Sequence, residues 1–300
     1  MNHMNKYILS TIIVFISTLT FAQDELLNLA ESNTAEDEKE PVSAFFTSRL
    51  AIGQSVETHR KNQLVLHVTH RFDALNTGAY NLWGLDAANI RIGFDYGITD
   101  KFNVAFGRTR ISKTYDLFGK YKILQQQSSG MPITLTAFIA TAAITEPKKE
   151  DAANYGLNTI TLSDRLSYTT QLLIARNFAD RVSFQLMPTY VHKNNLNLYN
   201  NASLLANNGT FALGLGSSIF ITNMFAVNLE YYLRTGVVDT NPYNDAFSIG
   251  FDLETGGHIF QIQLSNSFQA GERAIITETA DDFWNGDIHL GFNITRTFQF

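Results

Sequence analysis

Residues 287–300, the last segment of the chain, alternate between apolar residues and polar residues or glycine, with one interruption at Arg296. Successive side chains on a β-strand point to opposite faces, so this alternation predicts a strand with one apolar and one polar face. Such a strand needs an apolar environment on one side only. The apolar face carries Ile288, Leu290, Phe292, Ile294, Phe298 and Phe300, and the other face carries His289, Gly291, Asn293, Thr295, Thr297 and Gln299.

The same two-residue period recurs along the chain and predicts about twelve strands, an even number. It is clearest at residues 64–72, 90–98 and 260–264, where apolar side chains oppose polar or small ones. Weaker versions run through residues 102–111, 114–124, 132–144, 165–177, 182–192, 210–221, 225–235 and 247–254.

The connections between these segments differ in length according to their order. Links after even-numbered strands are mostly tight turns, whereas those after odd-numbered strands are mostly long, with a short exception near Ser112. Long loops on one rim and short turns on the other are typical of outer-membrane barrels, whose short turns face the periplasm. We therefore predict that residues 63–300 form an all-β, transmembrane antiparallel up-and-down β-barrel of about 12 strands.

Charged residues in the middle of the strands favour a membrane barrel over a large soluble sandwich, which is the alternative fold. In lipid every backbone group must be paired within the protein, so a sheet has to close on itself. A lipid-facing barrel is apolar outside and polar inside, which suits the mid-strand charges better than an apolar interior does. The predicted lumen-facing polar residues are His67, Arg71, Arg91, Asp95, Asp116, Lys120, Lys122, Glu230, Arg234, Asp252, Glu254 and His289.

The N-terminus predicts export. Residues 1–22 have a short basic start, an apolar run and a small-residue end at Ala22, which is the composition of a secretory signal peptide. A retained anchor is the alternative, but the run is shorter than the roughly 20 residues that a spanning helix needs. The chain has no cysteine, which excludes a lipid attached to an N-terminal cysteine and also a disulfide scaffold.

Two further segments separate the predicted signal peptide from the barrel. Residues 23–41 carry seven acidic residues against Lys39 alone, and we expect an acidic disordered linker. Most of the net charge of −6 lies there, and this acidic balance argues against nucleic acid as a partner. Residues 42–62 are more apolar but do not alternate. We expect a periplasmic lead-in or a plug in ordered contact with the barrel.

Several sequence blocks resemble a family of uncharacterised outer-membrane β-barrel proteins of Gram-negative bacteria. The resemblance implies the fold and the compartment, namely the outer membrane reached through the periplasm, and no substrate. The terminal Phe298 and Phe300 resemble the assembly signal that barrel-assembly machinery reads, so that machinery and outer-membrane lipid are the expected partners. The matching blocks are Thr47–Leu50, Gly53–Glu57, Thr69–Phe72, Trp83–Asp100, Lys113–Asp116, Pro188–His192, Glu230–Tyr232 and Gly286–Arg296.

Catalytic and metal-binding residues are not evident in the sequence. His67 and His289 fall on the polar faces of the first and last strands, but a metal site needs three or more ligands, so we predict hydrogen-bonded lumen histidines and no metal or other cofactor. A serine hydrolase needs a serine, a histidine base and an orienting acid on compatible faces. Ser163, Ser265 and Ser267 have no local histidine partner, so we assign no catalytic residue.

The balance of charges on the polar face bears on function. Five basic and five acidic residues are predicted to line the lumen, and balanced charges favour salt bridges that fill a narrow interior over the one-sign ring of a selective pore. We predict a non-enzymatic narrow channel or a surface-loop platform. The alternatives are an outer-membrane hydrolase acting on lipid or lipopolysaccharide, and a module that binds a periplasmic partner through residues 23–62.

Overall fold

A computed structural model describes residues 39–146, 160–199, 204–205 and 207–300. The chain divides into two units, residues 1–40 and 41–300, and every strand found among the described residues lies in the second unit. The predicted signal peptide and almost all of the predicted acidic linker lie outside the described residues. No helix among the described residues is long and apolar enough to cross a membrane.

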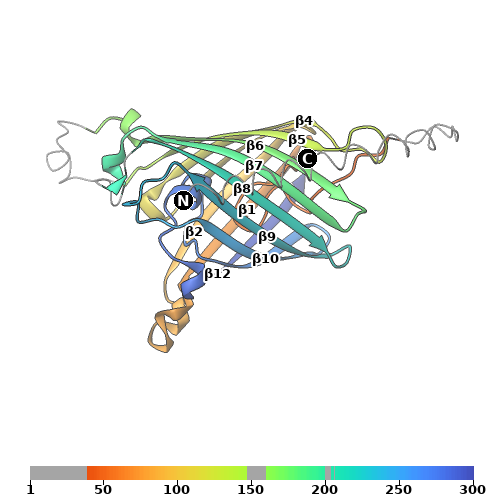
Figure 1. Cartoon of the computed structure of the whole chain (residues 1–300). Helices are drawn as coiled ribbons and strands as arrows, with labels where there is room; N and C mark the ends of the chain where they lie inside the picture. Colours follow the sequence, from red (N-terminus) through yellow and green to blue (C-terminus); the bar gives the residue numbers. More distant parts are fainter. Residues whose placement is uncertain (1–38, 147–159, 200–203, 206) are drawn as a thin grey trace, which may run out of the picture. The chain divides into compact units, whose positions relative to one another are not determined.

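Twelve antiparallel strands follow one another around a closed barrel in chain order, as the alternation predicted (Figure 1). Each strand pairs with its neighbours in sequence, so the topology is up-and-down. The strands are β1 (Gln63–Ala74), β2 (Ala88–Thr99), β3 (Phe102–Thr109), β4 (Tyr115–Leu124), β5 (Thr134–Ala143), β6 (Leu166–Phe178), β7 (Val182–Lys193), β8 (Gly209–Phe220), β9 (Phe225–Thr235), β10 (Ala246–Glu254), β11 (His258–Ser265) and β12 (His289–Gln299).

The first and last strands close the barrel. β1 pairs antiparallel with β12 in a register that places Val68 opposite Ile294 and Thr69 opposite Asn293. Residues of like polarity therefore face the same side across the seam, which is the closure that the matched polar faces predicted.

The wall is polar inside and apolar outside. On β2, Arg91 and Asp95 are buried in the lumen, whereas Ile92 and Phe94 point outward and are 49% and 48% exposed. An apolar outer surface on a closed sheet fits the lipid phase, because closure leaves no unpaired strand edge there. The single closed sheet excludes the soluble sandwich.

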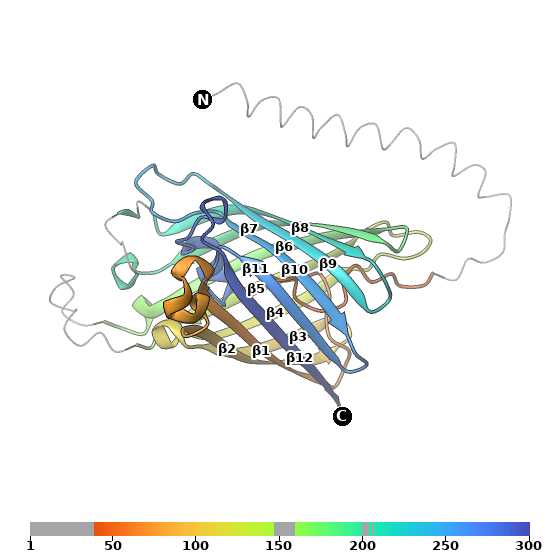
Figure 2. The same cartoon turned by 90° about the horizontal axis from the view of Figure 1, so that it is seen from below.

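The two rims differ as the loop lengths predicted. In Figures 1 and 2 the long connections project from one end, and the tight turns and the C-terminus lie at the other. We call these ends the long-loop rim and the short-turn rim. Trp83 and Trp284 both lie in exposed positions on the long-loop rim, in neighbouring loops joined by a hydrogen bond of 2.8 Å from Leu75 N to Ile288 O.

The last residues lie at the short-turn rim. Phe298 is 37% exposed and Phe300 is 76% exposed, in agreement with an outward-facing end of β12. Their role as an assembly signal stays a prediction.

Candidate functional site: a filled lumen

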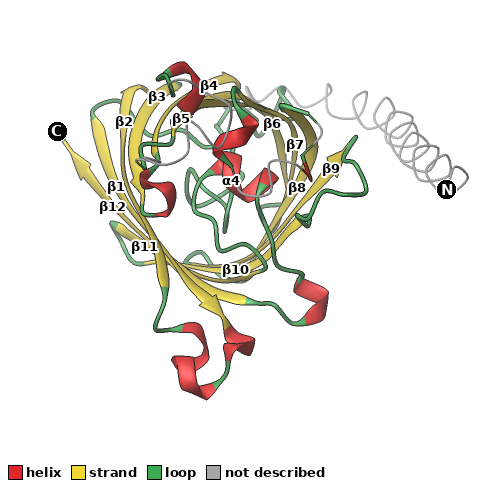
Figure 3. Cartoon of the chain, turned by 90° about the vertical axis from the view of Figure 1, so that its left-hand side faces the viewer, coloured by secondary structure: helices red, strands yellow, loops and turns green. Residues whose placement is uncertain are grey.

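A short hairpin from the N-terminal segment occupies the inside of the barrel. Figure 3 looks along the barrel and shows loop segments and the short helix α4 (Glu272–Thr277) within the ring of strands. Residues 47–56, which we call the lumen hairpin, turn back at an isolated bridge between Arg49 and Gln54. Two backbone hydrogen bonds of 3.0 Å, from Leu50 N to Gly53 O and from Ser55 N to Ser48 O, hold this turn.

Lys120 on β4 binds the base of the lumen hairpin. Its Nζ donates hydrogen bonds to the backbone oxygens of Ser48, Ser55 and Glu57 at 2.6, 2.8 and 3.2 Å. An ammonium group has three donors, so these carbonyls satisfy it completely. This matters because Lys120 is fully buried, and a buried charge without partners is costly.

The opposite wall binds the tip of the lumen hairpin. The Glu230 carboxylate on β9 accepts hydrogen bonds from Ile52 N at 2.6 Å and Gly53 N at 3.0 Å. On β7, the Gln185 side chain accepts from Val56 N at 2.8 Å and donates to Gln54 O at 2.7 Å. Strands on different sides of the barrel thus hold one segment, which fixes its position in the lumen.

Glycines in the wall make room for the hairpin tip. A Cβ atom on Gly216 would lie 2.6 Å from Leu50 Cδ1, and one on Gly250 would lie 2.7 Å from Ala51 Cβ. The reverse holds at Gly53 of the hairpin, where a Cβ would come within 2.7 Å of a Glu230 carboxylate oxygen and still closer to the Tyr232 hydroxyl. The wall and the hairpin are therefore shaped to each other.

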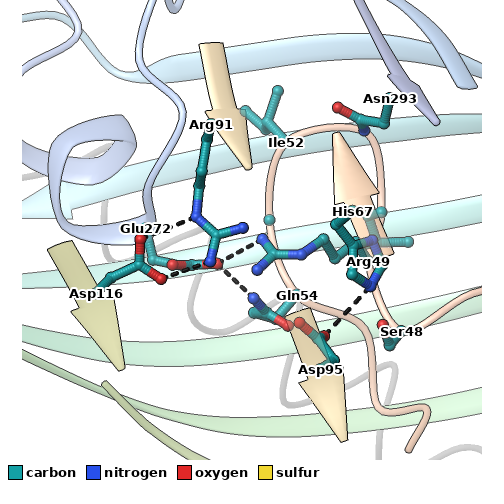
Figure 4. A network of polar contacts seen from close by, with 12 residues as sticks. Ser48, Arg49, Ile52, Gln54, His67, Arg91, Asp95, Asp116, Glu272 and Asn293 are labelled. Atoms are coloured by element: carbon teal, nitrogen blue, oxygen red, sulfur yellow. Dashed lines mark hydrogen bonds and ion pairs between the residues drawn. The ribbon is translucent and has the colours of Figure 1, made fainter. Parts of the chain in front are cut away.

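Helix α4 fills the lumen from the long-loop rim and contacts the lumen hairpin. Glu272 accepts a hydrogen bond of 2.8 Å from the Arg49 guanidinium and another from the Gln54 side chain (Figure 4). Burial alone works to raise the pKa of Glu272, but the nearby charges of Arg49 and Arg91 outweigh it and lower the pKa below its ordinary value. Glu272 therefore stays ionised and joins the two segments.

A second ionic cluster anchors the C-terminal end of α4. The Glu278 carboxylate contacts Arg273 and, at 2.8 Å, Nζ of Lys193 on β7. Burial works to raise the pKa of Glu278, but the positive charges of Arg273 and Lys193 outweigh it and lower the pKa. Both cations also lie over the ring of Tyr199, at 4.2 Å for Lys193 and 4.9 Å for Arg273.

The predicted lumen residues are buried inside the barrel, except for two near the rims. Arg234 and Glu254 are half-buried, and Arg234 bonds to Asp245 in a loop at 2.9 Å. Those that are buried are His67, Arg71, Arg91, Asp95, Asp116, Lys120, Lys122, Glu230, Asp252 and His289.

The partners of these residues differ from the expectation that the wall charges pair with one another. Among the described residues, Arg91 and Asp116 are the one pair from the predicted ten charges that forms an ion pair, with Arg91 Nε 2.9 Å from Asp116 Oδ2. Lys122 instead pairs with Glu57 of the N-terminal segment at 3.1 Å. Arg71 donates to the Asn293 side chain at 2.9 Å. Asp252 accepts from Gln261 at 3.0 Å.

The sequence-based selection missed the residues that the filling segments contribute. Arg49, Glu57, Glu272 and Glu278 lie on segments without a two-residue period, so no pattern in the sequence assigned them to the lumen. The wall positions were found because alternation alone decides which way a strand residue points.

The predicted hydrogen-bonded lumen histidines are present, but they lie apart. His67 Nδ1 is 3.1 Å from the Thr295 hydroxyl, and His289 lies farther along β12 at the long-loop rim. His289 contacts Phe72 O through Nδ1 at 2.9 Å and Asp281 through Nε2 at 2.8 Å.

A serine, a histidine and an acid do come near one another at this rim. Ser265 lies opposite His289 in the β11–β12 register, and Asp281 is bonded to His289. The Ser265 hydroxyl donates to Phe247 O at 2.8 Å, and both ring nitrogens of His289 are already engaged. A hydrolase needs a free nitrogen on its histidine base facing the serine, so this grouping is not arranged as a catalytic triad.

Comparison with known proteins agrees with this architecture. Residues 45–298 match the family model described as a membrane bound beta barrel domain (DUF5777), and the chain belongs to this family. This is the class that the closed barrel with its apolar exterior defines. A barrel of this kind resides in the outer membrane of a Gram-negative bacterium, which is the localisation predicted from the sequence.

Similar solved structures have low sequence identity to the chain. An outer-membrane channel from Pseudomonas putida F1 is 12% identical with a TM-score of 0.50, and the match covers 81% of this chain and 98% of that one. The NanC porin is 9% identical with a TM-score of 0.48, over 79% of this chain and 100% of that one. No curated protein matches the chain in sequence.

Proposed function

We propose that this protein is a non-enzymatic outer-membrane channel for small solutes, closed by its own lumen hairpin. The observation that carries the proposal is the position of residues 47–56 inside the barrel, held by polar side chains from opposite walls. Large apolar side chains could fill the interior equally well if the lumen were always closed. A polar interior around a separate segment stays compatible with water when that segment leaves.

The space above the hairpin supports the same proposal. A cavity of about 650 Å³ opens at the long-loop rim and is lined in part by Lys113, Tyr199 and Glu278. Beside α4, the cavity lined in part by Asp116, Thr169 and Glu272 is about 30 Å³. A wide entrance above a filled centre is the geometry of a channel in its closed state.

Conductance across planar bilayers tests the proposal. We expect few or no current steps from the mature wild-type chain, and stable steps from a variant that lacks residues 44–56. Because α4 also narrows the lumen, a second variant lacks residues 44–56 and carries a Gly-Ser linker in place of residues 268–280. Heat-modifiable migration in electrophoresis verifies that each variant has a folded barrel. Two folded variants that both fail to conduct would refute the channel.

A reversible lock provides the matched control, since the chain has no cysteine of its own. Ala51 of the hairpin packs directly against Gly250 of the wall. A disulfide needs Cβ atoms about 3.5–4.5 Å apart, so a small shift of the hairpin accommodates one. We expect the Ala51→Cys/Gly250→Cys variant to be silent when oxidised and to gain openings when reduced. Current steps from the oxidised protein that match those of the variant lacking residues 44–56 would show that the hairpin does not control the lumen.

A further inference from the structure

Three potential metal ligands meet near the short-turn rim, on the lumen side of the paired strands β1 and β2. They are His59 from the segment that follows the lumen hairpin, His67 from β1 and Asp95 from β2. The Asp95 Oδ2 atom lies 3.4 Å from His59 Nε2 and 3.3 Å from His67 Nε2. The three ligand atoms all lie within 4.8 Å of one another.

The two distances to Asp95 are longer than most hydrogen bonds and equal those between the ligands of a bound metal. An N–H to oxygen hydrogen bond has its most common length at about 2.9–3.0 Å, shorter than either contact. Ligands bound tetrahedrally to zinc at about 2.0–2.1 Å are themselves about 3.3–3.4 Å apart, which matches both distances. In addition, His67 Nε2 and Asp95 Oδ1 are buried atoms without a hydrogen-bond partner of acceptable geometry. Buried polar atoms of this kind call for an explanation.

The surroundings of His67 orient its ring for coordination. Its other nitrogen, Nδ1, lies 3.1 Å from the Thr295 hydroxyl on β12. When Nδ1 carries the proton and donates it to that oxygen, the lone pair of Nε2 points to Asp95. A metal-bound histidine almost always uses its second nitrogen in this way.

Two cations near the site are engaged by other groups, so the types of ligand decide which metal suits it. Arg49 lies beside His67 and Asp95 in Figure 4, and its guanidinium reaches away to Glu272. Lys120 is occupied by three carbonyl oxygens of the N-terminal segment. With one carboxylate and two imidazoles, the site suits zinc or a neighbouring first-row metal, whereas calcium and magnesium prefer more oxygen ligands.

We propose that His59, His67 and Asp95 form a binding site for a divalent first-row transition metal, with a fourth coordination position left for water. His59 belongs to the N-terminal segment, and the other two ligands belong to the wall. A bound metal therefore cross-links the segment to the barrel. Binding itself does not depend on the channel proposal.

Titration of the mature chain in detergent tests the site. The protein is prepared without a histidine tag, and bound metal is first removed with EDTA. Calorimetry with Zn²⁺ and absorption spectroscopy with Co²⁺ are expected to show one tight site per chain. We expect His59→Ala and Asp95→Asn to weaken binding more than 100-fold, and Thr295→Val to weaken it roughly 10–100-fold as an outer-shell change does.

His70→Ala is the matched control, because His70 lies on β1 three residues from His67 but faces outward against Phe292. It should bind metal as the wild type does. His59 lies outside the strands, so His59→Ala keeps the barrel folded even if a wall variant does not. A folded wild type that binds neither metal, or equal binding by wild type and His59→Ala, would overturn the proposal.

Discussion

The lumen holds two segments that come from opposite rims and are bound by different chemistry. The lumen hairpin is held mainly by hydrogen bonds between wall side chains and its backbone, as at Lys120 and Glu230, and by close packing against glycines. Helix α4 is held by buried ion pairs around Glu278 and by its buried Ile275 and Ile276 side chains. The contacts that hold the hairpin depend on the shape of its backbone more than on which side chains it carries. The contacts that hold α4 depend on the charges around Glu278.

This contrast predicts different responses to substitution, and amide hydrogen exchange measures both segments in one experiment. Exchange reports the free energy of local opening, so each segment provides its own value. Residues 47–56 report on the lumen hairpin, and residues 270–278 report on α4.

The largest effect is expected from Glu278→Gln. This change leaves Lys193 and Arg273 buried beside each other without their shared carboxylate. Breaking a buried ion pair costs about 3–5 kcal/mol, so amides of α4 should exchange roughly 100-fold faster or more. The lumen hairpin should change much less. Equal acceleration in both segments would show that they open as one unit and would end the contrast.

Gly53→Val is expected to speed exchange in the lumen hairpin and to change α4 much less. Any Cβ at this position collides with Tyr232 and Glu230, so the hairpin tip must leave its two hydrogen bonds to the carboxylate. Overpacking of this kind costs about 1–3 kcal/mol, which is below the cost of the broken ion pair at Glu278. Exchange in residues 47–56 should rise roughly 100-fold.

Gly119→Ala is the control for this substitution. Gly119 faces outward on β4, and a Cβ there would meet its nearest atom at 3.6 Å, an ordinary contact. Exchange in the lumen hairpin should match that of the wild type. If Gly53→Val leaves exchange in the hairpin unchanged, the tip is not seated against Glu230 as described.

The same contrast explains what the sequence could and could not predict. Arg91 and Asp95 were assigned to the lumen correctly, because the orientation of a strand residue follows from its position in the alternation. The antiparallel closure of β1 on β12 follows equally from an even number of strands. These properties are local or follow from closure, so one sequence suffices for them.

The contents of the lumen could not be predicted in the same way. Lys120 was correctly placed inside, but its partners are carbonyl oxygens more than sixty positions away in the chain. His59 had no periodic neighbours to indicate its direction, so its position beside His67 and Asp95 was missed. Such contacts depend on the path that an irregular segment takes through the barrel. The pattern of residue types along the sequence does not reveal that path.

The smallest predicted effect concerns Glu272, which joins the two segments through Arg49 and Gln54. Its pKa in the folded protein lies below the ordinary value of 4.5. A carboxyl of this kind stabilises the fold fully above its unfolded pKa, and the contribution is lost as pH falls through the lower folded pKa. Protection in both segments should therefore decrease together below about pH 4.

Glu272→Gln separates this link from other acid effects. The amide keeps the size of the side chain and an oxygen that can accept from Arg49, but it loses the charge. Because one cation contacts Glu272 and two contact Glu278, the expected effect is smaller, about 1.4 kcal/mol or roughly tenfold faster exchange in both segments at pH 7. The further loss of protection on acidification should be smaller than in the wild type, because this group no longer titrates. Glu254→Gln, a half-buried position near the short-turn rim, should leave the wild-type pH profile in place. If Glu272→Gln accelerates exchange in only one segment, the carboxylate supports that segment alone, and the hairpin and α4 respond to pH independently.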